Sequence, residues 1–108
     1  MRYRSFHERL IQTVVTAPGD APESLRRAVL ERAQRSTGGT DAVPQALAQY
    51  VDTVAHHAYK VTDADVAALQ RSGQSDDSIF EITVAAAVGA AMHRLSRGMM
   101  ALRGEEAD

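Results

Sequence analysis

The sequence contains no cysteine and no tryptophan in its 108 residues. Without a thiol, the chain has no means of forming a disulfide, a thiolate zinc site or an iron–sulfur cluster, and it has no cysteine nucleophile. A chain without cysteine is compatible with a reducing compartment. This absence removes several classes of redox and metal protein from consideration.

Long apolar runs and a signal peptide are also missing. The basic residues near the start are not followed by an apolar segment of the length that a signal peptide needs. The longest apolar stretch, from Ile82 to Met92, contains Thr83 and Gly89 and is shorter than the ~20 residues of a membrane span. We therefore expect a cytoplasmic protein without a membrane partner.

A strong excess of one charge is absent as well. The net charge of −2 argues against a strongly basic nucleic-acid binder. Seven arginines do concentrate in the first third of the chain: Arg2, Arg4, Arg9, Arg26, Arg27, Arg32 and Arg35. They form either a local positive face or an ordinary solvated helix surface, and we predict no nucleic-acid partner.

Size and composition predict one folded domain. A chain of this length can bury a modest core, and 44% hydrophobic with 24% charged residues is ordinary for a globular protein. Because the apolar spacing is helical throughout, we predict a single all-α domain over residues 1–108, with about five helices.

The first two predicted helices follow from apolar spacing and turn residues. Phe6, Leu10 and Val14 are four residues apart and mark the apolar face of a helix over about 5–16. A Pro-Gly-Asp turn follows, and Asp20 is predicted to cap a second helix that ends at a Gly-Gly pair, residues 38–39. The inward stripe of this second helix comprises Leu25, Ala28, Val29 and Ala33.

Two shorter helices are predicted in the middle of the chain. Asp41 and Pro44 open the third, whose apolar face comprises Leu47, Val51, Val54 and Ala58. Thr62 is predicted to cap the fourth, with Asp65 three residues on, in an arrangement close to a capping box. That helix buries Val66 and Leu69 and ends at Gly73, a left-handed C-cap.

The last predicted helix is the longest. Ser75 caps it, and it runs to about Arg103, a length of roughly 40 Å at the rise of an α-helix. One face is apolar through Phe80, Val84, Val88, Ala91, Leu95 and Leu102. The run from Ala85 to Ala91 is small on every side, which lets another backbone approach closely. We expect a second subunit to provide part of its burial.

The segment VTDADVAALQRSGQSDDSIFEITVAAAVGAAMHRL resembles the carboxymuconolactone decarboxylase and alkyl hydroperoxidase D-like superfamily. Members often carry V-T-D-x-D-V-x-x-L, then a glycine with a polar helix start, then a small-residue helix that ends in Arg-Leu. The matching residues are Val61, Thr62, Asp63, Asp65, Val66, Leu69, Gly73, Ser75, Asp76, Ile79, Ala86, Arg94 and Leu95. The resemblance covers about residues 50–102 and implies an all-helical fold that assembles into homotrimers or homohexamers.

The chain departs from the peroxidase branch of that superfamily. The branch resembles a redox enzyme built on Cys-x-x-Cys, followed four residues later by histidine, with a thiolate nucleophile. If His57 takes the place of that histidine, Tyr50 and Thr53 occupy the cysteine positions. Neither forms a thiolate, so we do not expect peroxidase activity of the family type, and we predict no cofactor.

Three residues are candidates for acid/base chemistry: Glu81, His56 and His57. If Glu81 is partly buried among small residues, its pKa is raised and suits proton transfer; the alternative is a solvent-facing carboxylate near a helix N-terminus. Asp52 precedes His56 by four residues, a spacing at which it orients an imidazolium or forms a surface ion pair. Adjacent histidines do not chelate one metal ion from a helix, so we predict no metal site.

Tyr50, His93 and Arg94 are candidate binding residues. The ring of Tyr50 is expected to pack while its hydroxyl reaches a partner. His93 and Arg94 either bind an anion or line a subunit interface, unless His93 is a structural histidine. The sequence therefore predicts a homo-oligomeric helical protein without thiol chemistry, with a small-molecule ligand as a further partner. Its alternatives are a lyase-like enzyme using acid/base chemistry and a scaffold or binding protein without catalysis.

Overall fold

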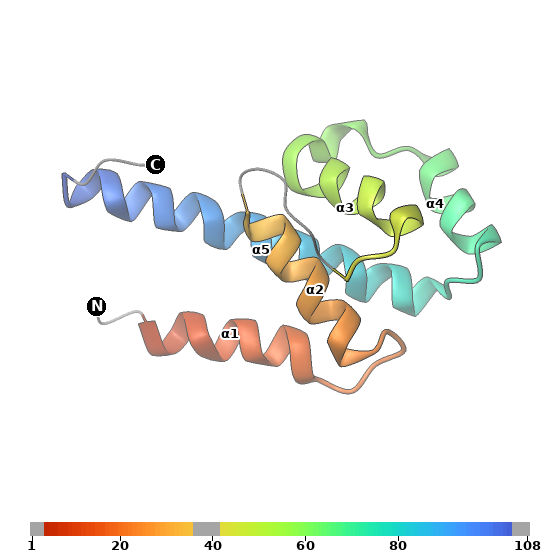
Figure 1. The fold of residues 1–108 in the computed structure, drawn as a ribbon, viewed down its shortest axis with the longest axis horizontal. Helices are drawn as coiled ribbons and strands as arrows, with labels where there is room; N and C mark the ends of the chain where they lie inside the picture. The colour runs from red at the N-terminus through yellow and green to blue at the C-terminus, as the bar shows by residue number, and fades with distance from the viewer. Residues whose placement is uncertain (1–3, 36–41, 105–108) are drawn as a thin grey trace.

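The computed structural model describes residues 4–35 and 42–104, and these fold into five α-helices and one short 3-10 turn (Figure 1). The elements are α1 (Arg4–Thr16), α2 (Glu23–Gln34), α3 (Gln45–His57), η1 (Ala58–Lys60), α4 (Asp63–Arg71) and α5 (Asp76–Leu102). No strand occurs in these two ranges, so the predicted all-α class is confirmed. Gly38, Gly39 and Asp41, predicted to end one helix and open the next, lie outside the described residues, as does Arg2.

The core lies where α2 crosses α5. The buried side of α5, which we call its inner face, comprises Ile79, Ile82, Ala85, Ala86, Gly89 and Ala90. At Gly89 an added Cβ would lie 2.3 Å from the carbonyl oxygen of Leu30 and 2.9 Å from the Cβ of Ala33. The two helices therefore pack backbone against backbone, which small side chains alone permit.

This crossing accounts for part of the small-residue run within one chain. Ala85 and Ala86 are 0% exposed, and Ala90 is 4% exposed, because α2 of the same molecule covers them. Ala87 and Ala91 of the same run are exposed, so burial of that side by a second subunit stays a prediction. The inward stripe predicted for α2 is confirmed, since Ala28, Val29 and Ala33 are buried there.

The apolar faces that spacing identified on α1 and α5 are only partly turned toward the core. On α1, Phe6 is 57% exposed, whereas Val14 of the same predicted face packs against the core. On α5, Phe80 is 68% exposed and Leu102 is 80% exposed, whereas Val88 packs against the core. The fully buried residues, such as Val15 on α1 and Ile82 on α5, lie outside the predicted faces.

Helix ends follow local sequence closely. Thr62 and Asp65 form a reciprocal capping box at α4, with Asp65 N–H donating to Thr62 Oγ1 at 3.3 Å and Thr62 N–H donating to Asp65 Oδ2 at 2.9 Å. Ser75 caps α5 by accepting the N–H of Ser78, and Gly73 has the predicted left-handed φ of 103°. Asp20, in contrast, does not cap α2, whose N-cap residue is Pro22.

The helix α5 is also long and apolar enough to cross a membrane, judged by length and composition alone. This differs from the sequence-based expectation, which considered only the stretch from Ile82 to Met92. Core helices of soluble proteins pass the same test, and the inner face of α5 is packed against α2.

Candidate functional site

Glu81, the main candidate for acid/base chemistry, anchors the turn between α1 and α2. Its Oε1 accepts the backbone N–H of Ala21 at 2.7 Å, and its Oε2 accepts the N–H of Asp20 at 3.0 Å. These two hydrogen bonds, then the charge of Arg26, hold the pKa of the Glu81 carboxyl below its ordinary value despite partial burial. The raised pKa considered from the sequence is therefore wrong, and both carboxylate oxygens have structural partners.

Three further hydrogen bonds, from Arg26 and Ser75, hold the same turn in place. Arg26 is 6% exposed and donates from Nε to the carbonyl of Ala21 at 3.0 Å and from Nη1 to that of Val14 at 3.1 Å. Ser75, at the start of α5, donates its hydroxyl to Asp20 Oδ2 at 3.0 Å. The turn is thus a polar cluster that joins α1, α2 and α5.

His56 and His57 are exposed on the last turn of α3 and do not meet Glu81. The carbonyl of Ala55, one residue earlier, accepts a hydrogen bond from Arg94 at 2.9 Å. Arg94 follows Glu81 by 13 residues in α5, which is about 20 Å along a helix axis. The described chain therefore does not bring the predicted acid/base pair together.

Asp52, for which the sequence left open a role in orienting His56 or a surface ion pair, forms an ion pair with Arg32 of α2. Its two carboxylate oxygens accept hydrogen bonds from Nε and Nη2 of Arg32, each at 2.8 Å. This bidentate pair ties α3 to α2. Arg26 is buried and Arg32 is paired, so these two arginines of the predicted cluster do not extend an open positive face.

Tyr50 is placed as predicted, with a buried ring and a partnered hydroxyl. It is 8% exposed, and its hydroxyl lies 2.6 Å from Thr83 Oγ1. Since the Thr83 hydroxyl donates its single hydrogen to the carbonyl of Ile79, Tyr50 is the donor to Thr83. Tyr50 also lines a shallow hollow between α3 and α4, together with Thr53 and Asp65.

His93 and Arg94 serve different surfaces of α5. Arg94 stabilises the C-terminal end of α3 through the carbonyl of Ala55, a common role for arginine at exposed helix carbonyls. His93, half-buried, points about 100° away around the helix. Their predicted joint anion site is not formed within the described chain.

Metal-binding groups do not converge in residues 4–35 and 42–104. No cluster of three or more histidine, aspartate or glutamate side chains there is arranged to hold an ion. Every buried side-chain nitrogen or oxygen atom in the same residues has a hydrogen-bond partner.

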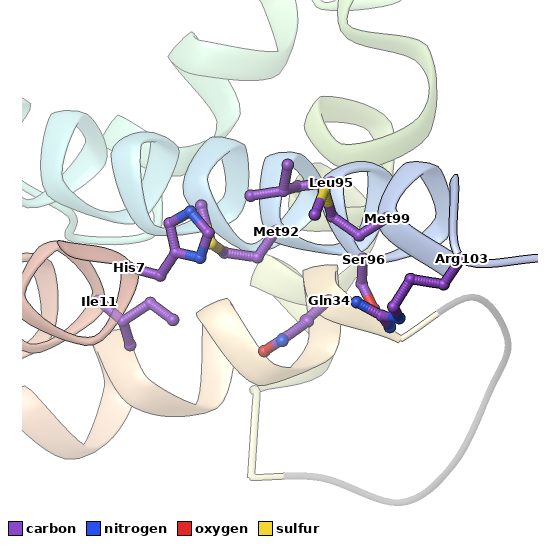
Figure 2. A pocket seen from close by; sticks show the side chains of 8 residues that line it. All are labelled: His7, Ile11, Gln34, Met92, Leu95, Ser96, Met99 and Arg103. Atoms are coloured by element: carbon purple, nitrogen blue, oxygen red, sulfur yellow. The ribbon is translucent and has the colours of Figure 1, made fainter. Parts of the chain in front are cut away.

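A groove separates α1 from the C-terminal half of α5 (Figure 2). Its volume is about 240 Å³, and its apolar wall comprises Ile11, Met92, Leu95 and Met99. The polar groups of His7, Gln34, Ser96 and Arg103 also line it. Figure 2 shows His7 and Ile11 of α1 facing Met92 of α5, with Arg103 at the C-terminal end of the groove.

The outward side of α5 carries a second apolar surface, which we call the outer stripe. It comprises Phe80, Val84, Ala87, Ala91, Leu95, Gly98 and Leu102. Val84 is half-buried and the other members are exposed. Since the inner face lies on the opposite side of the helix, α5 is apolar on two sides, and residues 4–35 and 42–104 cover the inner one while leaving most of the outer stripe exposed.

Comparisons with protein-family models, with curated proteins and with solved structures gave no match to this chain. The superfamily resemblance therefore stays a prediction. What the chain does has to be inferred from its own surfaces.

The sequence predicted part of the outer stripe but not that this side of α5 is exposed in the single chain. A helix that is apolar on two sides gives no indication of which side a neighbour covers. The available signal was size, because the small residues on one side permit a close crossing and the larger Phe80, Leu95 and Leu102 lie on the other. Reading those two sides separately would have identified the exposed one.

Proposed function

We propose that this chain is a homo-oligomeric helical scaffold without catalytic activity, from a cysteine-free branch of the carboxymuconolactone decarboxylase-like superfamily. The observation that carries this proposal is the outer stripe of α5, where Phe80 and Leu102 are 68% and 80% exposed. Large continuous apolar surfaces on single chains mark sites of association. Self-association covers this stripe with a surface that the chain itself supplies.

The polar interior supports a scaffold over an acid/base enzyme. A general acid or base needs a free oxygen or nitrogen within reach of substrate and a pKa near the working pH. Glu81 uses both oxygens on backbone N–H groups, and its pKa is lowered. His56 and His57 lie on an exposed helix end, next to the Ala55 carbonyl that accepts from Arg94, 13 residues after Glu81 in α5.

Light scattering on three proteins tests the proposal. The wild type is expected to have a mass that is a multiple of 11.7 kDa. Ala91→Glu places a charge at the centre of the outer stripe and is expected to give the monomer mass with unchanged helicity. Ala64→Glu, at an exposed alanine of α4, is the matched control and is expected to keep the wild-type mass. A monomeric wild type contradicts self-association.

The groove between α1 and α5 favours a second candidate function, the binding of a medium-chain alkyl compound. Its wall of Ile11, Met92, Leu95 and Met99 suits an alkyl chain. Calorimetric titration with decanol is expected to show saturable binding that Met99→Glu weakens by at least tenfold. A non-saturable signal that Met99→Glu leaves unchanged contradicts this candidate.

A further inference from the structure

The spacing of the residues in the outer stripe is symmetric about its midpoint. From Phe80 to Leu102 its members are separated by 4, 3, 4, 4, 3 and 4 residues, and Ala91 is the midpoint. An 11-residue repeat over three turns stays close to the period of a straight helix. The stripe therefore runs along one side of α5 for about 33 Å, at 1.5 Å per residue.

We infer that two copies of this chain pair through their outer stripes, with the two α5 helices antiparallel about a two-fold axis beside Ala91. This inference rests on the proposed self-association and adds the surface, the orientation and the register. In this register Phe80 faces Leu102 of the other copy, and Ala91 faces its own equivalent.

Side-chain sizes complement each other in this register. Val84 lies opposite Gly98, and Ala87 lies opposite Leu95, so that a larger side chain meets a smaller one at each inner position. Two alanines meet at the centre, where the helices approach most closely. The bulkiest layers, Phe80 with Leu102, lie at the two ends, so the helices are closest at Ala91 and diverge toward the ends, as crossing helices do.

A parallel pairing in register does not place larger side chains opposite smaller ones. Each residue then meets its own equivalent, so that Leu95 opposes Leu95 and Gly98 opposes Gly98. Bulky layers alternate with layers that leave gaps, and gaps in an apolar interface lose contact energy. Volume therefore favours the antiparallel arrangement.

Charge along α5 favours the same orientation. The acidic residues of the helix lie in its first two turns, the segment 82–92 carries no charge, and arginines follow: Asp76, Asp77, Glu81, then Arg94, Arg97 and Arg103. Antiparallel pairing places the acidic end of one helix beside the basic end of the other, and it opposes the two helix dipoles. Parallel pairing places like charges together.

A two-fold contact restricts the assembly. It produces a dimer, or a larger assembly with an even number of subunits such as a dihedral hexamer, and it is incompatible with a trimer. Of the two states that the superfamily resemblance implies, the hexamer accommodates this contact. The mass in solution is therefore expected to be an even multiple of 11.7 kDa.

Single-cysteine variants measure the register directly, because the natural chain contains no cysteine. Under mild oxidation Ala91→Cys is expected to cross-link rapidly and almost completely, since the two positions lie beside the axis within disulfide reach. Ala87→Cys alone is expected to stay uncross-linked, because its two copies are offset by eight residues, about 12 Å along the axis. A mixture of Ala87→Cys and Leu95→Cys is expected to cross-link.

The control and the outcomes separate the inference from the proposed function. Ala64→Cys, exposed on α4, reports the rate of random collision, and thermal unfolding confirms that each variant folds. Self-cross-linking of both Ala91→Cys and Ala87→Cys indicates parallel pairing and overturns the inference. An oligomeric mass without cross-linking above the control also overturns it, while self-association stands. A monomeric wild type overturns both.

Discussion

The two apolar sides of α5 differ in how they meet a neighbour. The inner face is built from small residues around Gly89 and is covered by α2 so closely that a Cβ at this position would clash with the Leu30 carbonyl. The outer stripe carries larger side chains at its ends, and this chain leaves them exposed. One side of α5 is thus closed by an intramolecular contact, and the other side is exposed.

The difference shows how a small domain divides its apolar residues between folding and association. A contact made backbone against backbone orders the chain because it tolerates no change in volume. A contact that leaves the side chains exposed in the single chain contributes little to folding. Its energy becomes available when a second surface covers it. Changes on the two sides of α5 are therefore expected to affect different measurements.

The largest effect is expected at Gly89. Gly89→Leu forces a side chain into the Leu30 backbone, and we expect a loss of more than about 3 kcal/mol in unfolding free energy, measured by urea denaturation. The matched control is Gly98→Leu, where an added Cβ meets nothing within 4 Å. The control is expected to gain up to about 1 kcal/mol at dilute concentration from helix propensity. Equal stability of the two variants contradicts the close crossing.

Truncating one side chain on each side of α5 sharpens the comparison. Ile82 is 0% exposed, so Ile82→Ala is expected to cost about 2–5 kcal/mol of unfolding free energy. Leu102 is 80% exposed, so Leu102→Ala is expected to change it by less than about 0.5 kcal/mol at dilute concentration. At high concentration the second variant is expected to associate more weakly than the wild type. The comparison fails if Leu102→Ala destabilises the dilute chain as much as Ile82→Ala does.

Local signals made the helix ends predictable, whereas partners distant in sequence were not. Thr62 and Ser75 cap their helices through residues three positions away, so the short motif contains both partners. Glu81 meets Asp20 and Ala21, which lie 61 and 60 positions away, and no spacing rule identifies such a partner. The direction in which the pKa of Glu81 shifts could therefore not be predicted from the sequence, because backbone N–H donors of the turn between α1 and α2 determine it.

Acid is expected to weaken the anchor that Glu81 provides beside the inner face. Because folding lowers the pKa of the Glu81 carboxyl, the unfolded chain binds more protons than the folded chain as the pH falls. The stabilisation of the folded state by ionised Glu81 is therefore complete above the ordinary pKa of 4.5. It is lost as the pH falls through the lowered pKa of the folded state. Glu81→Gln is expected to lose about 1–2 kcal/mol at pH 7 and to show a smaller decrease in stability below pH about 4.5. Urea denaturation at several pH values measures both. An identical pH dependence in the two proteins contradicts the assigned role.

The smallest effect is expected from shortening the chain after Gly104. The removed residues include Glu105, Glu106 and Asp108, which follow the basic end of α5 in sequence. Removing them increases the charge difference between the two ends of the helix, so a few-fold tighter association at low ionic strength is expected. Sedimentation at low and high salt measures it, and the gain is expected to vanish in high salt. A weaker association after truncation contradicts the charge argument.

The central claim is that the open side of α5 is covered by another copy of the chain, and thermal unfolding over a hundred-fold range of protein concentration tests it most directly. Association that stabilises the folded state makes the unfolding temperature depend on concentration. The wild type is expected to unfold at a higher temperature as its concentration rises, and Ala91→Glu is expected to show no such rise. An unfolding temperature of the wild type that stays constant over the whole range would contradict the claim.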